Sequence, residues 1–230
     1  MKGLLYNDIL LNRNYFIGTV IAMLAGAVVC PLLVHILDYG YNSIYVLAFV
    51  VIQLVILTIA DEWLARSLEN SLKNRFADYV LAAGISKNRY VFHLLENNLI
   101  STVFGIAMCC IVQLSMFLFG DKTLVNSQSF TALFFMAFLV GAVEYMIIPL
   151  VIPLKSAEKA GLIGGLVIGF VFIMPAAILN TLCETESIMS MLMKMISQQW
   201  FIPAASGLFV GLYALFYFII LARVKRGDMC

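Results

Sequence analysis

Apolar residues fill six long stretches of this chain, and short polar segments separate them. The stretches span residues 16–37, 44–60, 99–119, 130–152, 162–182 and 203–222. Each comes close to the ~20 residues that a helix needs to cross a hydrocarbon layer of ~30 Å. The pattern therefore predicts an all-α integral membrane protein, in which residues 1–230 form a single transmembrane domain of six helices.

The basic residues predict how these helices are oriented. Of the 14 Lys and Arg residues, only Lys122 and Lys194 lie in segments on one side of the predicted spans. Those on the other side are Lys2, Arg13, Arg66, Lys73, Arg75, Lys87, Arg89, Lys155, Lys159, Arg223, Lys225 and Arg226. Because short loops rich in Lys and Arg stay on the cytoplasmic side, both termini are predicted to be cytoplasmic.

Composition supports a membrane protein, since 63% of the residues are hydrophobic and the net charge is only +1. That charge does not favour a nucleic-acid partner. The first residues do not resemble a signal peptide, because Asn7, Asp8 and Arg13 interrupt any apolar core, so the first span is expected to be kept. Of five cysteines, only Cys183 is placed near the outer surface, so neither a disulfide framework nor a metal site is predicted.

Two amphipathic segments flank the predicted spans. In residues 2–14, Leu and Ile alternate with polar residues at helical spacing, which predicts an N-terminal helix lying flat on the inner surface, or else a simple extension of the first span. In residues 183–201, Met189, Leu192 and Ile196 recur at helical spacing. This second segment is expected either to pack on the outer bilayer surface or to cover an exit.

Residues 61–98 are too many for a simple connector between two spans. Apolar residues recur there at steps of three or four: Leu64, Leu68, Leu72, Phe76, Tyr79 and Val80. The spacing predicts an amphipathic helix that continues the second span into the cytoplasm. Gly84 is expected to end this helix, and Ser86 to cap the next one. A solvated loop is the alternative.

Glu144 stands out as an ionisable residue within a predicted span, where a charge costs a few kcal/mol. We expect it either to be protonated and hydrogen-bonded to Tyr145, Gln53 or Gln113, or to line a water-filled cavity. Together, Gln53, Gln113 and Glu144 are the candidates for lining a translocation path. A single intramembrane acid, with no repeat between the two halves of the chain, argues against a proton-coupled carrier.

The sequence was also tested for enzyme motifs. It contains no phosphate-binding loop of the Gly-x-x-x-x-Gly-Lys type. Residues 61–66 resemble the Glu-Glu-x-x-x-Arg motif of glutamate-class intramembrane proteases, and His93 and Asn97 supply a His-x-x-x-Asn pair. The other histidine, His35, is predicted near the opposite face of the membrane, and the first acidic position is Asp. No catalytic residue is therefore assigned.

Two cytoplasmic segments resemble the membrane subunits of type-2 ABC exporters. Residues 73–91 follow that family's pattern at Phe76, Tyr79, Leu81, Ile85, Ser86, Lys87 and Val91, with Gly84 where proline is usual. The segment 148–160 is similar to the family's Pro-Leu, basic residue and Glu-Lys-Ala at Pro149, Leu150, Lys155, Glu158, Lys159 and Ala160. The opening Met-Lys-Gly-Leu-Leu, followed by Asp8, is similar too.

The resemblance implies which residues meet an ATPase. The elbow between the second and third spans is expected to be a coupling helix that docks on a separate ATP-binding subunit. Its contact residues are Phe76, Tyr79, Val80, Leu81, Ala82, Ala83, Gly84, Ile85, Ser86, Lys87 and Arg89. A second cytoplasmic loop carries Lys155, Glu158 and Lys159.

The resemblance also implies the assembly and the cargo. The chain is expected to be a permease of the bacterial cytoplasmic membrane that binds no cofactor itself, while ATP and Mg²⁺ bind in the partner. Two ATP-binding subunits, a second permease copy or close paralogue, and the lipid bilayer are the expected partners. The cargo is expected to be amphipathic or hydrophobic, as for exporters of antimicrobial peptides and phenol-soluble modulins. A membrane anchor or sensor, and an intramembrane protease-like enzyme, are the alternatives.

Overall fold

The computed structural model describes residues 10, 13–36, 42–74, 80, 84–168 and 200–226. These residues form helices and no strand. The helices are α2 (Arg13–Ile36), α3 (Asn42–Lys73), α5 (Lys87–Phe119), the short η2 (Lys122–Leu124), α6 (Ser127–Leu154), α7 (Ala157–Ile168) and α10 (Phe201–Arg226). Most of the predicted amphipathic segments 2–14 and 183–201, and the second part of the fifth predicted span, lie outside the described residues.

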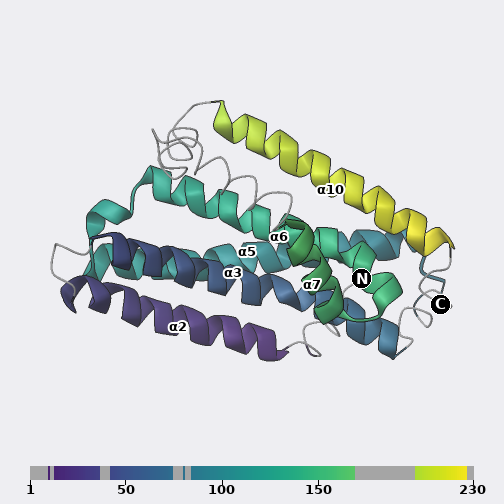
Figure 1. Ribbon diagram of the computed structural model, residues 1–230, viewed down its shortest axis with the longest axis horizontal. Helices are drawn as coiled ribbons and strands as arrows, with labels where there is room; N and C mark the ends of the chain where they lie inside the picture. Colours follow the sequence, from purple (N-terminus) through teal and green to yellow (C-terminus); the bar gives the residue numbers. More distant parts are fainter. Residues whose placement is uncertain are drawn as a thin grey trace.

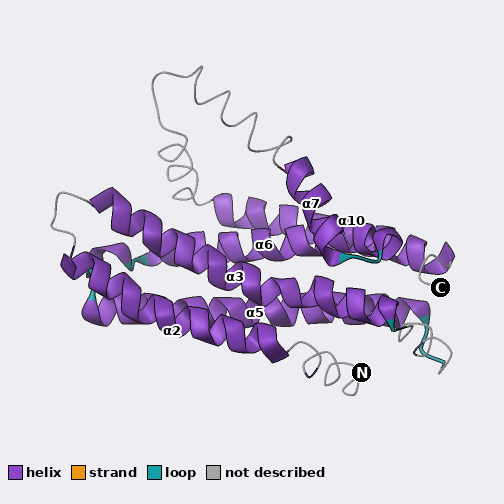
Figure 2. Cartoon of the chain, turned by 60° about the horizontal axis from the view of Figure 1, so that its bottom comes forward, coloured by secondary structure: helices purple, strands orange, loops and turns teal. Residues whose placement is uncertain are grey.

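The five long helices run side by side along one axis of the molecule (Figure 1). Helix α3 packs against α2, α5 and α6, so it lies inside the bundle. Helix α10 packs on α5 and α6, on the edge away from α2 (Figures 1 and 2). After the end of α6 the chain turns sharply, and α7 packs back on α6. Helices α3 and α5 therefore each contact most of the other helices.

Close packing of the central helices depends on small residues. A Cβ atom added at Gly105 of α5 would lie 3.1 Å from the Leu57 side chain and 3.2 Å from the Ala60 side chain of α3. At Gly26 of α2, an added Cβ would come within 2.6 Å of Ile52. Small residues let membrane helices approach closely, which supplies the dispersion contacts that hold them together without a hydrophobic driving force.

Length and composition make the long helices of this bundle compatible with a membrane protein. Among the described residues, five helices are long and apolar enough to cross a membrane: α2, α3, α5, α6 and α10. They carry exposed apolar side chains, of which Ile21, Val103 and Val210 are examples. The part of the fifth predicted span that the structure describes lies within α7, which ends at Ile168. The long apolar spans are thus confirmed for these helices, while the orientation of the chain stays a prediction.

The two helices that flank the elbow extend well beyond the predicted spans. Helix α3 continues past residue 60 to Lys73, which confirms that the amphipathic segment prolongs the second span. Helix α5 begins at Lys87, well before residue 99. Helix α5 is therefore unbroken from Lys87 through its apolar stretch, and α3 is unbroken from its apolar stretch to Lys73. At 1.5 Å per residue, their 32 and 33 residues are each about 50 Å long.

Candidate functional site

The turn that precedes α5 contains a glycine in the left-handed conformation and the helix cap expected from the sequence. Gly84 has a φ of 85°, in the left-handed region that favours glycine. The Ile85 N–H donates to the Val80 carbonyl oxygen at 3.4 Å, which is the bond that closes a helix at such a glycine. The Ser86 hydroxyl then accepts from the Arg89 N–H and caps α5. The Ser86 cap is confirmed, whereas α3, the helix that Gly84 was expected to end, already ends at Lys73.

Glycine stands at position 84, where the ABC exporter pattern has proline, and it changes the backbone geometry of the turn. Proline fixes φ near −65°, whereas Gly84 has a φ of 85°. The backbone at this residue therefore has the opposite handedness, a conformation that proline cannot adopt.

The described part of the turn is anchored on the bundle. Val80 is buried, and Ile85 packs against the same apolar cluster, which also contains Leu72 and Leu94. The Lys87 ammonium donates to the Lys225 carbonyl oxygen at 3.3 Å, so the end of α10 is held beside the start of α5. Of the predicted contact residues, Gly84, Ser86, Lys87 and Arg89 are exposed. Phe76, Tyr79, Leu81, Ala82 and Ala83 lie outside the described residues.

A second turn, between α6 and α7, lies at the same end of the bundle. Lys155 ends α6 with a φ of 48°, and Lys155, Glu158 and Lys159 are all exposed. The Ala157 N–H at the start of α7 donates to the Glu69 carboxylate at 3.1 Å. That carboxylate is also bound by Lys73 and Arg66 of its own helix. Glu69 thereby ties the second turn to α3, next to the first turn.

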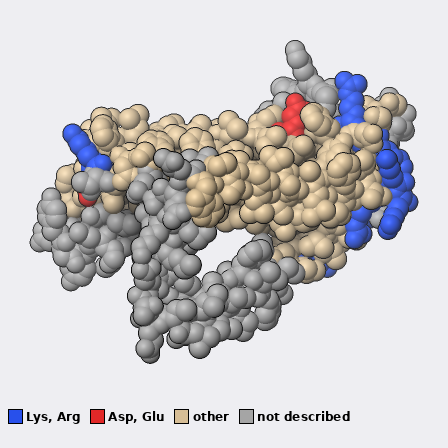
Figure 3. All heavy atoms as spheres, turned by 90° about the horizontal axis from the view of Figure 1, so that it is seen from above, with Lys and Arg blue, Asp and Glu red and all other residues tan. Residues whose placement is uncertain are grey.

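The basic residues gather at this end. The described ends of α3, α5 and α10 bring Lys73, Lys87 and Lys225 there. Figure 3 shows Lys and Arg side chains concentrated at one end of the visible face. The two loops that the sequence assigned to one side of the membrane are therefore neighbours in space, at a positively charged end.

The structure does not bring the three predicted path residues together. Gln53 and Gln113 are buried among apolar residues, and neither side-chain amide nitrogen has a hydrogen-bond partner among the described residues. Glu144 instead lines a hollow of about 480 Å³ between α3, α6 and α7, together with Glu62, Arg66 and Glu158. No bond to Tyr145, Gln53 or Gln113 forms within the described chain, which favours the cavity alternative for Glu144.

Asp61 is a second acid inside the bundle, and the sequence analysis placed it wrongly in the charged elbow. Its side chain is 0% exposed. The Ser101 hydroxyl donates to Asp61 Oδ1 at 2.7 Å, and the Thr102 hydroxyl donates to the same oxygen at 3.2 Å. Glu144 is therefore not the only acid in the interior, and the argument against proton coupling that rested on a single acid no longer holds.

The signal that could have located Asp61 lies on α5. Asn97, Asn98, Ser101 and Thr102 recur at helical spacing and form one polar stripe at the start of an apolar span. The Asn98 amide extends this polar seam to α6 by donating to the Gly141 carbonyl oxygen at 3.1 Å. A polar stripe of this kind needs a polar partner, and Asp61 provides it.

The protease-like residues are engaged in separate local contacts. Glu62 accepts from Arg66 at 3.1 Å on the same helix. His93 and Asn97 are hydrogen-bonded to each other at 3.3 Å, one turn apart on α5. Among the described residues, no group of three His, Cys, Asp or Glu side chains lies close enough to hold a metal ion.

No family model matches the sequence, and neither a curated protein nor a solved structure matches it significantly. What the chain does must therefore be inferred from its own residues.

Proposed function

We propose that this chain is the permease subunit of an ATP-driven ABC exporter in a bacterial cytoplasmic membrane. The proposal rests on one observation: two turns, around Gly84 and Lys155, lie side by side at one end of the bundle. Both turns are exposed, and the described surface around them is basic. A separate ATP-binding subunit would dock on this end, and the ATP and Mg²⁺ would bind in that partner.

The helices on either side of the first turn are suited to transmit a motion. Helix α5 is unbroken from the turn into its apolar stretch, α3 is unbroken from its apolar stretch to Lys73, and close packing at Gly105 keeps the two helices in contact. When the ATPase pair closes, a push on the turn would shift α3 and α5 as one unit. The Glu69 link would make the start of α7 follow, because Ala157 is bound to that carboxylate.

The cargo that fits best is amphipathic or hydrophobic, and a peptide is the leading candidate. The interior is mostly apolar, and its few polar side chains lie at different depths. Gln53 is eight residues before Asp61 on α3, or about 12 Å at 1.5 Å per residue. A second copy of the chain, or a close paralogue, would complete a path that five or six helices cannot enclose alone.

A mild-detergent pull-down from native cells, with mass spectrometry and an ATPase assay, tests the proposal. We expect an ATP-binding subunit to be recovered with the chain. Gly84→Ala would reduce its recovery or uncouple hydrolysis from export, because an L-residue at a φ of 85° is strained and the turn must shift. Lys87→Ala would also weaken coupling, because it removes the bond that holds α10 to the turn.

Gly207→Ala on α10 is the matched control, since an added Cβ there meets nothing within 4 Å. Recovery of the chain without any ATPase would contradict the proposal and leave the anchor and enzyme alternatives. Full coupling in both the Gly84→Ala and Lys87→Ala variants would show that the turn is not the docking site.

A further inference from the structure

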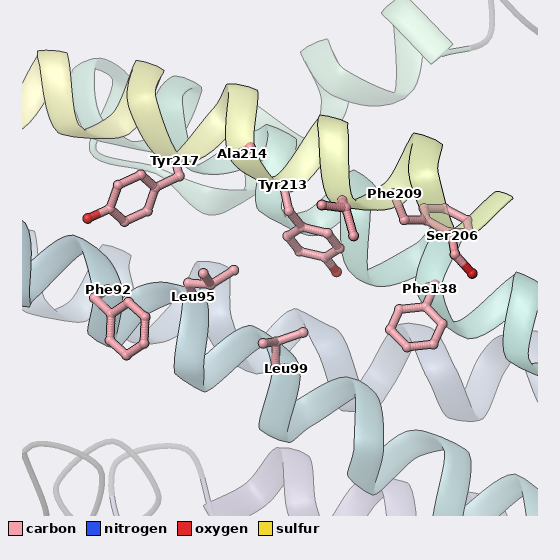
Figure 4. A pocket seen from close by; sticks show the side chains of 10 residues that line it. Phe92, Leu95, Leu99, Phe138, Ser206, Phe209, Tyr213, Ala214 and Tyr217 are labelled. Atoms are coloured by element: carbon pink, nitrogen blue, oxygen red, sulfur yellow. The ribbon is translucent and has the colours of Figure 1, made fainter. Parts of the chain in front are cut away.

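A groove lined by aromatic side chains lies between α10 and the pair α5 and α6 (Figure 4). Its volume is about 550 Å³, in the range of pockets that hold small organic ligands. The aromatic residues of its wall are Phe92, Phe138, Phe209, Tyr213 and Tyr217. Phe92 and Val210 are 52% and 70% exposed, so the groove opens on the outer surface of two membrane-spanning helices.

Tyr213 connects the groove to the polar interior. Its side chain extends from α10 toward α5 and α6 (Figure 4). A Cβ added at Gly141 would lie 2.9 Å from the Tyr213 hydroxyl and 2.5 Å from the Thr102 hydroxyl, so both hydroxyls face the same glycine. Thr102 in turn donates to Asp61. One layer of hydroxyl groups therefore separates the aromatic groove from the buried carboxyl.

The buried Asp61 carboxyl behind this layer has no cationic partner in the described chain. Asp61 Oδ2 is buried without a hydrogen-bond partner, and no Lys or Arg of the described chain pairs with Asp61. Arg66 is held by Glu62 and Glu69. Burial without a cationic partner disfavours the ionised form of this carboxyl, and a cation bound in the groove would favour the ionised form in return.

We propose that the groove binds a lipophilic organic cation. Aromatic faces attract a cation through their negative π-surfaces and also cover its apolar body. Asp61 supplies the preference for positive over negative charge. Because the groove opens on α5 and α10, two helices long and apolar enough to cross a membrane, the ligand would reach it from the membrane. Binding itself does not depend on the chain being a permease, whereas the role of this cation as exported cargo rests on the proposed function.

Tetraphenylphosphonium and tetraphenylborate are suitable probes, because they share one shape and carry opposite charges. Equilibrium dialysis against the purified full chain in detergent, with protein-free micelles as the blank, measures saturable binding of each. We expect tetraphenylphosphonium to bind saturably and tetraphenylborate not to bind. Asp61→Asn is expected to weaken tetraphenylphosphonium binding by about tenfold, and Phe209→Leu by about twofold to fivefold.

A pair of variants on α10 tests the groove without touching the carboxyl. Ala214 lines the groove, so Ala214→Phe fills it and should abolish binding. Leu215 is exposed but does not line the groove, so Leu215→Phe should leave binding unchanged. These two variants decide the matter even if Asp61→Asn does not fold.

Three outcomes would overturn the proposal. Equal saturable binding of both probes would mean apolar adsorption without charge selection. Absence of saturable tetraphenylphosphonium binding would mean that the groove holds no such ligand. Binding that survives Ala214→Phe but is lost in Glu144→Gln would place the cation in the hollow lined by Glu144. Since the dialysis uses the chain alone, none of these results depends on recovery of an ATPase.

Discussion

Gly141→Ala should destabilise the bundle strongly, because this glycine is where α5, α6 and α10 converge. The added methyl group would lie 2.5 Å from the Thr102 hydroxyl and 2.9 Å from the Tyr213 hydroxyl. Forced displacement of close-packed side chains costs about 1–3 kcal/mol. If Thr102 rotates away, it loses its hydrogen bond to Asp61, which costs about 0.5–3 kcal/mol more. Alanine favours a helix over glycine by about 1 kcal/mol, so the net loss is about 0.5–5 kcal/mol.

Thiol labelling during unfolding is a suitable assay, since Cys30 and Cys109 are buried free cysteines. A dye that fluoresces on reaction with thiols reports their exposure as temperature or denaturing detergent increases. Gly207→Ala is the matched control, because an added Cβ there meets nothing within 4 Å. The control should be as stable as the wild type or slightly more stable. If Gly141→Ala unfolds together with the control, the three helices do not meet at Gly141 as the structure places them.

Further predictions concern the turn, the ionic link and the two interior acids. Gly84→Pro should destabilise the chain more than Gly84→Ala, because proline cannot adopt a φ of 85°; limited proteolysis near residue 84 would reveal the difference, and equal cleavage would contradict it. Glu69→Gln should cost about 1–3 kcal/mol in the thiol assay, because it weakens two ion pairs and the bond to Ala157, and a neutral result would show that the link is dispensable. Asp61→Ala should lower the free energy of unfolding by about 1–3 kcal/mol, because it removes the hydrogen bonds from Ser101 and Thr102. Glu144→Gln should change the free energy of unfolding by less than about 0.5 kcal/mol, because the described chain offers Glu144 no hydrogen-bond partner. The reverse order would refute the different roles assigned to the two acids.

Local features of the fold could be predicted because each depends on neighbouring residues. Serine at 86 marks the start of α5 because its side chain caps that helix, and this prediction is confirmed. Gly84 has the left-handed backbone that favours glycine, although α3 already ends at Lys73. The apolar steps from Leu64 to Leu72 likewise predicted the extension of α3. Such patterns depend only on residues within a few turns of one another.

Features that depend on which helices meet could not be predicted in the same way. Asp61 follows an apolar stretch and precedes a charged one, so its neighbours in the sequence offered no reason to place it inside. Its burial depends on the Ser101 and Thr102 hydroxyls of another helix. Glu144 and the two glutamines were grouped because all are polar residues in spans, but helix packing separates them into different environments.

The bond between Lys87 and the Lys225 carbonyl has a practical consequence for work on this protein. Anything attached after α10 begins beside the turn that carries Gly84. An affinity tag or fluorescent protein at that end would crowd the proposed docking surface and could mimic a loss of partner binding. Labels are better placed in the segment around η2, which the bundle separates from the turn by the length of α5.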